Sequence, residues 1–435
     1  MSEGFHRPFV AVTPVSGVAL VPIREGATGV QLWARAVSDP RSLSVDDGTL
    51  AVARRALGGD TDEGALSALA ASLGLGAAGA LPAGRWATPL YGSPRWSLAV
   101  YLLPAPADVD AAGAWIDAAA LAESHRCGRA WPGPLLGHIA GALAGGVAEA
   151  VEVLRGPWPS PDALDLGAGV AVLPLRTPTL PPATHTNCVV LGGGDALIID
   201  PGSPYPDEQE RLARFIEHRM ERGDRFGRVV LTHQHHDHVA GAEALRARFD
   251  AVIVATRETA AALGGRARVD ELILDGDLLP FGDRAARVVA TPGHAKGHVA
   301  LVDDATGITV AGDMVAGQGT IVVDPPEGDM AVYLASLERL RGARVLIPAH
   351  GPPIPDPGAF IDALVGHRLW REERIANILR ERGALSIPAL VPLAYDDVPA
   401  ITHPLAARQA LAHLLKLQAQ GRAHPTPDGR WWVRA

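Results

Sequence analysis

The sequence predicts an α/β protein of three domains, and three observations carry this prediction. The chain has 435 residues, 48% of them hydrophobic and 20% charged, which is typical of a folded globular protein rather than a disordered one. Its middle part alternates short apolar runs with helical stretches, as an α/β domain does. A proline-rich break lies at 156–163, and the chain turns helical from about residue 358, so we place the domains at 1–155, 164–357 and 358–435.

The first domain combines extended and helical segments. Apolar runs predict strands at 10–23, 30–37 and 95–103, and Ala/Leu-rich runs predict helices at 63–75, 111–123 and 135–154. The segment therefore reads as a small α/β or α+β domain, followed by the linker GPWPSPDA.

The second domain repeats one pattern, in which an apolar strand runs into Gly, Pro, His or Asp. Strands of this kind are expected at 170–175, 188–193, 196–200, 228–233, 251–256, 286–294, 299–304, 307–313 and 344–350. Helical stretches at 207–221 and 331–341 lie between some of them. Strands that end in polar, metal-capable residues place the chemistry on one edge of a sheet.

The third domain is expected to have the outline of a winged helix. Helical stretches lie at 367–383, 386–395 and 406–421, and Pro427-Asp428-Gly429 then marks a hairpin turn. Among the aliphatic residues of the 406–420 helix, only Arg408 and Lys416 are basic, so it makes a poor nucleic-acid reader.

Charge and cysteine content narrow the function classes. The net charge is −9, distributed as −3 over 1–155, −9 over 156–360 and +3 over 361–435, so only the tail could attract a polyanion. Cys127 and Cys188 form no CxxC pair, which disfavours a disulfide framework or a thiolate zinc site. With no signal-peptide pattern at the start and no long apolar run, we expect a cytoplasmic protein without membrane contact.

The segment Thr232-His233-Gln234-His235-His236-Asp237-His238 carries the chemistry, because it crowds four histidines and an aspartate directly after an apolar strand. Such a cluster is favourable around a divalent cation, for which imidazole and carboxylate are good ligands. In an extended chain His233 and His235 point the same way and can bind one ion. Once the loop turns, Asp237 and His238 can face a second ion.

Three later segments supply further ligands. Thr291-Pro292-Gly293-His294, Gly312-Asp313 and Pro348-Ala349-His350-Gly351 each follow an apolar strand. Each also contains a glycine beside the polar side chain, which lets the backbone approach a crowded site.

With these motifs the sequence resembles the metallo-β-lactamase superfamily, which implies an αββα sandwich with a two-metal site on one edge of its sheets. The family's ligands fall on seven positions of this sequence: His233, His235 and His294 at the first ion, Asp237, His238 and His350 at the second, and Asp313 bridging both. The resemblance also implies that Asp200 accepts a hydrogen bond from a ligating histidine and fixes its tautomer.

The expected chemistry is hydrolysis. Five imidazoles and two carboxylates without sulfur suit two Zn(II) ions, and would also accept Mn, Fe or Co. Two such ions share a water and lower its pKa toward 7, so that hydroxide attacks a carbonyl carbon or a phosphorus. We assign catalytic roles to Asp313, as the bridge, and to Asp237, as a group that helps to move the proton. Family members that keep the bridging carboxylate hydrolyse thioesters, lactones or phosphodiesters. The resemblance therefore favours these three activities over lactam hydrolysis.

The segments 291–298 and 312–320, together with the winged helix, resemble the β-lactamase-like protein 2 branch of this superfamily. Its mammalian member is a zinc-dependent endoribonuclease that acts on single-stranded RNA, so the resemblance implies that RNA is one substrate class. His298, Gln318 and Lys296 are candidate substrate contacts.

The first domain resembles the Nudix hydrolases that act on coenzyme A derivatives, through Arg85-Trp86-Ala87-Thr88-Pro89, residues 98–103 and Trp115-Ile116-Asp117. The family's acidic, magnesium-binding helix falls on residues 67–75, where no carboxylate remains. We therefore predict a degenerate Nudix-like domain used for packing, dimerisation or substrate selection.

Two substrate classes stay open for the hydrolase, namely single-stranded RNA and small thioester or other acyl compounds. The Nudix-like resemblance tilts the choice slightly toward acyl thioesters. The alternatives are a nucleic-acid-binding regulator that works through its winged helix, and a lactam hydrolase. A homodimer is compatible with either reading.

Overall fold

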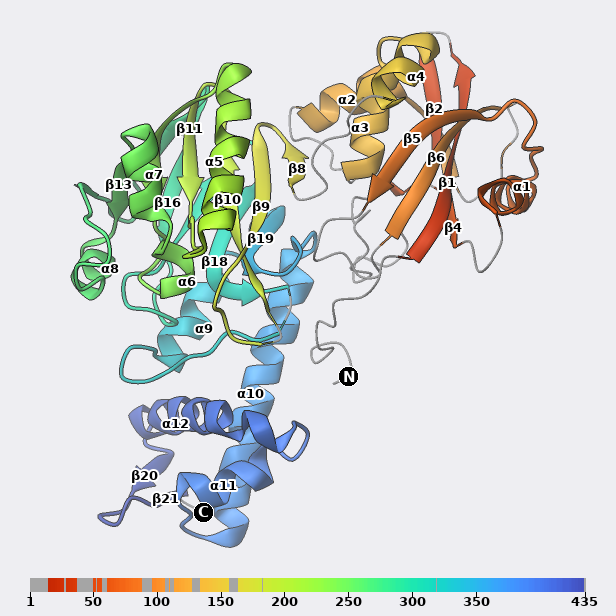
Figure 1. Cartoon of the computed structure of the whole chain (residues 1–435). Helices are drawn as coiled ribbons and strands as arrows, with labels where there is room; N and C mark the ends of the chain where they lie inside the picture. The colour runs from red at the N-terminus through yellow and green to blue at the C-terminus, as the bar shows by residue number, and fades with distance from the viewer. Residues whose placement is uncertain are drawn as a thin grey trace.

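The computed structural model describes residues 15–26, 29–36, 50–51, 53–56, 61–87, 96–105, 109, 113–126, 134–155, 163–181, 183–317 and 319–433. In chain order these residues form a sheet with flanking helices, a two-sheet sandwich and a small helical unit (Figure 1). Within them, no helix combines the length and the apolar character that crossing a membrane requires.

The N-terminal unit is one mixed sheet with helices on both faces. Its strands are β1 (Val15–Glu25), β2 (Val30–Ala36), β3 (Leu50–Ala51), β4 (Ala53–Ala56), β5 (Leu81–Ala87), β6 (Trp96–Pro104) and β7 (Gly113–Asp117). The central order is β3-β2-β1-β6-β5, and β1 and β6 run parallel. Alternate residues of β1 face opposite sides: Leu20 packs toward α1 (Asp62–Ser72), whereas Ala19 and Val21 pack toward α2 (Ala118–Arg126), α3 (Pro134–Leu143) and α4 (Val147–Arg155).

Two helices expected in this unit take a different form. Residues 113–117 of the expected helix 111–123 instead form strand β7, in which Trp115 and Ile116 pair with Trp33 and Leu32 of β2. Aromatic and β-branched residues with a partner strand favour extended structure over the helix propensity of the neighbouring alanines. The expected helix at 135–154 is divided into α3 and α4 at Gly146, whose φ of 103° lies outside the helical region.

The central unit is a four-layer αββα sandwich, as the sequence predicts. One sheet has the order β14-β13-β12-β11-β10-β9-β8 and the other the order β15-β16-β17-β18-β19. The first sheet comprises β8 (Leu164–Gly167), β9 (Val170–Arg176), β10 (His185–Leu191), β11 (Asp195–Ile199), β12 (Arg225–Val230), β13 (Val252–Ala255) and β14 (Glu271–Leu272). The second comprises β15 (Leu278–Phe281), β16 (Arg284–Ala290), β17 (Val299–Asp303), β18 (Ile308–Ala316) and β19 (Val345–His350).

Near-continuous apolar strands bury both faces of each sheet. In β11, Leu197 and Ile199 face the core between the sheets, whereas Ala196 and Ile198 face the outer helices. Those helices are α5 (Pro206–Glu221), α6 (His236–Val239), α7 (Ala242–Phe249) and α8 (Arg257–Ala262), and α9 (Met330–Glu338) covers the other sheet. Strands β11 and β12 are parallel, as are β18 and β19, so in each pair the carboxyl ends lie together at one edge of its sheet.

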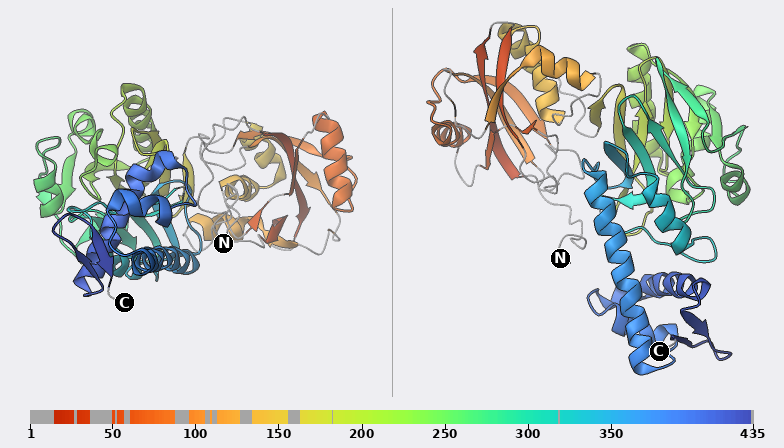
Figure 2. Two further views of the ribbon diagram at one scale, coloured as in Figure 1. Left: turned by 90° about the horizontal axis from the view of Figure 1, so that it is seen from below. Right: turned by 180° about the vertical axis from the view of Figure 1, so that it is seen from behind.

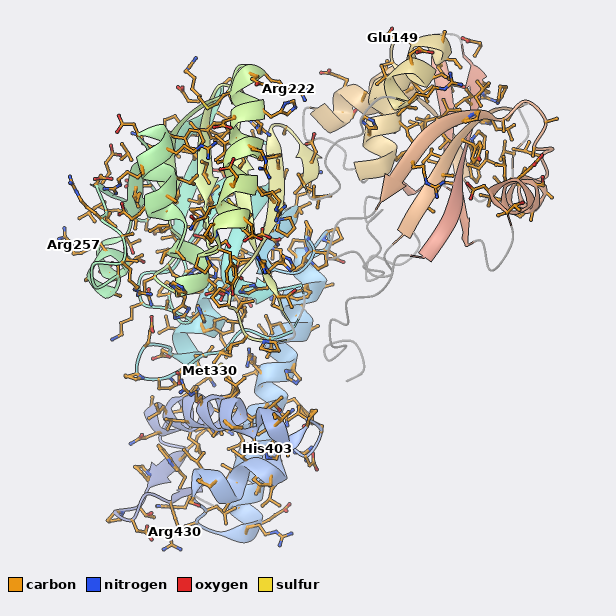
Figure 3. The ribbon with its side chains drawn as sticks, in the orientation of Figure 1. Glu149, Arg222, Arg257, Met330, His403 and Arg430 are labelled. Carbon is orange, nitrogen blue, oxygen red and sulfur yellow. The ribbon has the colours of Figure 1, made fainter. Side chains whose placement is uncertain are left out.

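The C-terminal unit has three helices and a hairpin, as expected of a winged helix. They are α10 (Pro357–Arg382), α11 (Ile387–Ala394) and α12 (His403–Ala419), with a short 3₁₀ turn at Ala400–Thr402, followed by β20 (Ala423–Pro425) and β21 (Trp431–Val433). Helix α10 begins against the sandwich and runs out into this unit, as two further views show (Figure 2). Met330, at the start of α9, lies near the junction of the two units (Figure 3).

Leu301, in β17, tests how far the core between the two sheets stabilises the sandwich. Its side chain is 1% exposed and belongs to that core. We expect Leu301→Ala to lower the free energy of unfolding by about 2–5 kcal/mol, because it removes buried methyl groups and leaves a cavity. Urea unfolding measures the change. The matched control is Leu274→Ala, at a leucine that is 64% exposed, and an equal loss in both variants would contradict this account of the core.

Candidate metal centre

The buried carboxylate of Asp200 holds the start of the histidine-rich loop. Asp200 follows β11, is 2% exposed and has a positive φ of 52°. The backbone N–H of Thr232 donates to its Oδ1 over 2.8 Å, and the Thr232 hydroxyl donates to its Oδ2 over 2.6 Å. The end of β12 is thereby tied to the end of β11, and the chain enters the loop in a fixed direction.

Two glycines allow the backbone segments around the centre to approach closely. A Cβ on Gly202 would lie 1.6 Å from the carbonyl oxygen of Asp237. A Cβ on Gly312, whose φ is 52°, would lie 2.5 Å from Nε2 of His298. Both positions therefore require glycine, and Gly312 is one of the glycines that the sequence places beside an expected ligand.

The first group of donors joins three imidazoles from two distant segments. His235 Nδ1 lies 2.9 Å from Nε2 of His233 and 2.9 Å from Nε2 of His294. The candidate ligand atoms of these three residues and of Asp313 all lie within 4.8 Å of one another. A proton can relieve the repulsion between two such nitrogens, whereas a cation can satisfy all of them together.

The second group comprises Asp237, His238 and His350, whose candidate ligand atoms also lie within 4.8 Å of one another. Asp313 stands between the two groups. Its Oδ1 is 3.3 Å from Nε2 of His350 and 3.6 Å from Nε2 of His238, and its Oδ2 is 3.4 Å from Nε2 of His294. One carboxylate therefore presents an oxygen to each group.

Four of the histidines use their other ring nitrogen to contact a fixed acceptor. The contacts are His233 Nδ1 with Thr232 Oγ1 (3.0 Å), His238 Nδ1 with Asp200 Oδ2 (2.8 Å), His294 Nδ1 with the Val322 carbonyl (2.7 Å) and His350 Nδ1 with the His185 carbonyl (2.9 Å). When Nδ1 donates the proton, the Nε2 lone pair faces the centre, which is the tautomer that a metal ligand needs. Asp200 lies within hydrogen-bond distance of His238, as its expected acceptor role requires, and that role stays a prediction.

The electrostatics of the cluster also fit cations. Burial, reinforced by the neighbouring imidazoles, lowers the pKa of His233 well below its usual value. Burial opposes charge on His238 too, but Asp200, Asp313 and Asp237 outweigh it and raise that pKa to about 10. Among the described residues, the buried atoms His238 Nε2 and Asp313 Oδ1 have no hydrogen-bond partner. Orphaned donors and acceptors of this kind, facing one another, fit a pair of bound divalent cations.

The three candidate substrate contacts, His298, Lys296 and Gln318, differ in where the structure places them. His298 is 1% exposed, contacts the Thr291 hydroxyl through Nδ1 and accepts from the Asp313 backbone N–H through Nε2, so both ring nitrogens face other residues of the protein and its contact with substrate stays a prediction. Lys296 is exposed. Gln318 lies outside the described residues.

Two further residues contact candidate ligands although they lie outside the motifs found in the sequence. Glu327 places Oε2 3.7 Å from Nε2 of His235, and that interaction is the main reason its pKa is lowered. Val322 contributes only a backbone carbonyl, and no side-chain pattern can reveal such a role.

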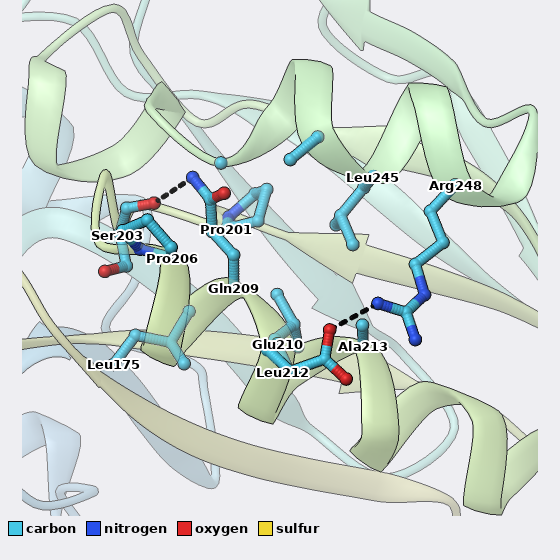
Figure 4. A pocket seen from close by; sticks show the side chains of 12 residues that line it. Leu175, Pro201, Ser203, Pro206, Gln209, Glu210, Leu212, Ala213, Leu245 and Arg248 are labelled. Atoms are coloured by element: carbon cyan, nitrogen blue, oxygen red, sulfur yellow. Dashed lines mark hydrogen bonds and ion pairs between the residues drawn. The ribbon is translucent and has the colours of Figure 1, made fainter.

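A pocket of about 170 Å³ lies between α5 and α7 (Figure 4). Its wall includes Pro201, and the ion pair between Glu210 and Arg248, at 2.6 Å, closes one side. None of the seven candidate ligands lines it, so it is separate from the metal centre.

Comparison with known proteins identifies the class. Residues 181–350 match the Metallo-beta-lactamase superfamily, and residues 386–431 match the Beta-lactamase associated winged helix domain. Residues 181–350 therefore form a metallo-β-lactamase domain, and residues 386–431 form the winged helix associated with it. A structure of a β-lactamase domain protein from Burkholderia ambifaria shares the fold, with a TM-score of 0.56, 23% identity, and coverage of 62% of this chain and 93% of that one.

Three proteins of known name are similar to this chain in sequence. It is 28% identical over 267 residues to the beta-lactamase-like protein 2 homolog of Drosophila melanogaster, covering 57% of this chain and 88% of that protein. It is also 28% identical over 224 residues to an atrochrysone carboxyl ACP thioesterase of Aspergillus chevalieri (49% and 69%). It is 37% identical over 166 residues to the hydroxyacylglutathione hydrolase of Acidiphilium cryptum (38% and 61%). No comparison tests the Nudix-like resemblance, which stays a prediction.

Asp200→Asn tests whether the hydrogen bonds of Asp200 with His238 and Thr232 contribute to metal binding. An asparagine amide can accept only at its oxygen, so either the Thr232 N–H loses its acceptor, or the Thr232 hydroxyl and the His238 ring lose theirs. We expect Zn²⁺ affinity to fall by about 10–100-fold, the usual effect of losing such a partner. Competition with a chromophoric chelator measures the affinity. Asp195→Asn is the matched control, since Asp195 is exposed at the start of β11, the strand that Asp200 follows. Equal Zn²⁺ affinity in the wild type and both variants would contradict the proposed role of Asp200.

Proposed function

We propose that the protein is a metal-dependent hydrolase of thioester or other acyl substrates. Two Zn²⁺ ions would be held by the seven residues of the two donor groups, with Asp313 shared between them. The single observation that carries this proposal is the position of Asp313, which directs one carboxylate oxygen to each group. The ligand set contains no sulfur, so Mn, Fe and Co remain admissible ions.

Each part of the centre has a distinct task in this proposal. When bound, the two cations act as Lewis acids and lower the pKa of a shared water toward 7. Asp313 and Asp237 would supply negative charge that offsets the charge of the cations, and Asp237, which is only partly buried, would help to move the proton. Asp200, Thr232 and the two backbone carbonyls hold four imidazoles in the tautomer that leaves a lone pair for the metal.

The relatives favour an acyl substrate. One is named a thioesterase and another a hydroxyacylglutathione hydrolase, and they are 28% and 37% identical to this chain over 224 and 166 residues. Because the carboxylate of Asp313 is present, the family resemblance implies that lactam hydrolysis is a less favoured activity than thioester hydrolysis.

The charges of the C-terminal unit do not favour RNA or a regulator. Five of the basic residues that could guide a nucleic acid are already paired: Arg371 with Asp397, Arg374 with Asp396, Arg408 with Asp324, Lys416 with Glu372, and Arg430 with Asp428. Arg368 is buried among neutral acceptors. These pairs reduce the positive charge that the described part of this unit can offer to phosphates.

Asp313→Ala is the variant that tests the function. We expect the wild-type protein loaded with Zn²⁺ to hydrolyse acyl-CoA or S-lactoylglutathione faster than a lactone, nitrocefin or single-stranded RNA. The variant should lose at least about 100-fold in kcat, because the cations lose the carboxylate that faces both donor groups. Release of free thiol measures the reaction.

Asp283→Ala is the control for this experiment, since the Asp283 side chain is 98% exposed. Wild-type turnover in Asp313→Ala would refute the bridging role. Cleavage of RNA alone, with every acyl compound inert, would refute the acyl assignment but not the metal centre.

A further inference from the structure

The segment 320–324, between β18 and α9, connects the C-terminal unit to the metal centre. The side chains of Ile321 and Val323 are buried in the cluster that includes Ala412 of α12 and Ile361 of α10. The backbone carbonyls of residues 321, 322 and 323 alternate in direction: the first and third accept from the C-terminal unit, and the second accepts from His294. This short stretch of backbone therefore has helices on one side and a candidate metal ligand on the other.

Arg368 of α10 makes the central contact on the helix side. It is 4% exposed, and its guanidinium donates to the Thr320 hydroxyl (3.0 Å), to the Ile321 carbonyl and to Gln409 Oε1 (2.8 Å). Gln409 of α12 in turn donates from Nε2 to the Val323 carbonyl over 3.3 Å. The planar fork of an arginine suits this task, because several donors on one rigid group fix several acceptors at once.

The same guanidinium also reaches the neighbourhood of Asp313. It lies 5.7 Å from the centre of the Tyr333 ring, and the Tyr333 hydroxyl donates to the carbonyl of Met314 over 2.8 Å. Met314 follows Asp313 directly in β18. Every hydrogen-bond acceptor of Arg368 among the described residues is neutral, so the group does not serve as one half of a buried ion pair. Its partners instead lie on the segments that orient two candidate ligands.

We propose that Arg368 is a positioning residue of the metal centre, through which the winged helix holds segment 320–324 and thereby orients His294. The inference rests on the proposed metal-dependent function. Without the arginine, segment 320–324 keeps its apolar anchors but loses the contacts that set the direction of its carbonyls. The Val322 carbonyl then no longer fixes the tautomer and rotation of the His294 ring. The winged helix thus acts as a structural support for catalysis in this chain.

Co²⁺ titration of the full-length protein tests this role, because the visible absorption of bound Co²⁺ reports the ligand geometry directly. The wild type should bind two ions. In Arg368→Met we expect one of the two binding steps to weaken by about tenfold, the lower end of the effect of losing a ligand's partner, with a changed absorption band for that step.

Arg371→Met is the matched control. Arg371 lies on the same helix, is 3% exposed, and pairs with Asp397 and with the Ala394 carbonyl inside the C-terminal unit. This variant should lower the melting temperature but leave both Co²⁺ steps and their spectra unchanged. A loss of Co²⁺ affinity in Arg371→Met as large as in Arg368→Met would overturn the proposal, since the effect would then be general destabilisation.

Two milder variants decide the question even where Arg368→Met does not fold. Gln409→Met and Thr320→Val each remove contacts of the same network, and Thr320 is exposed, so its replacement is tolerated. Both should weaken the same Co²⁺ step in the same direction. Wild-type Co²⁺ binding in both variants would refute the positioning role alone, whereas absence of any Co²⁺ binding by the wild type would refute the proposed function with it.

Discussion

The arrangement of the metal centre depends on one buried carboxylate, that of Asp200. It accepts from the backbone and hydroxyl of Thr232 and from the ring of His238, so it contacts both ends of the loop that carries four of the seven candidate ligands. The Thr232 hydroxyl passes the constraint on to His233. A buried carboxylate is stable only when its oxygens are satisfied, and this one is satisfied by the groups that it has to orient.

The remaining candidate ligands come from the other sheet, and the packing of the two sheets brings them close to the histidine-rich loop. His294 follows β16, Asp313 lies in β18 and His350 ends β19, while the histidine-rich loop follows β12. Close approach of these segments requires glycine at Gly202 and Gly312, where any side chain would collide with its neighbour. The site is crowded with like donors in a buried setting, an arrangement that costs stability in the protein alone and is compensated when cations bind.

The C-terminal unit is part of this construction rather than a separate module. Its helices share a hydrophobic cluster with the second sheet, and its polar side chains reach the segment that carries the Val322 carbonyl. In α12 the buried face includes Gln409, His413 and Leu414, so the helix that would read nucleic acid in a winged helix is here largely used for packing. Several basic residues of the unit are likewise paired within the protein, so the net charge of +3 over the tail overstates the positive charge that is free to bind a partner.

The sequence by itself determined most strands of the sandwich, though not β8, β14 and β15, together with the outline of the winged helix and the seven candidate ligands. These features are local, since an apolar run that ends in His or Asp beside Gly is legible within a few residues. Tertiary structure alone decided the pairing of Trp115 with Trp33, the inward position of His298, and the roles of Glu327, Val322 and Arg368. Each of these depends on a contact between segments far apart in the chain, several involve only backbone atoms, and neither kind of contact leaves a pattern in the order of side chains.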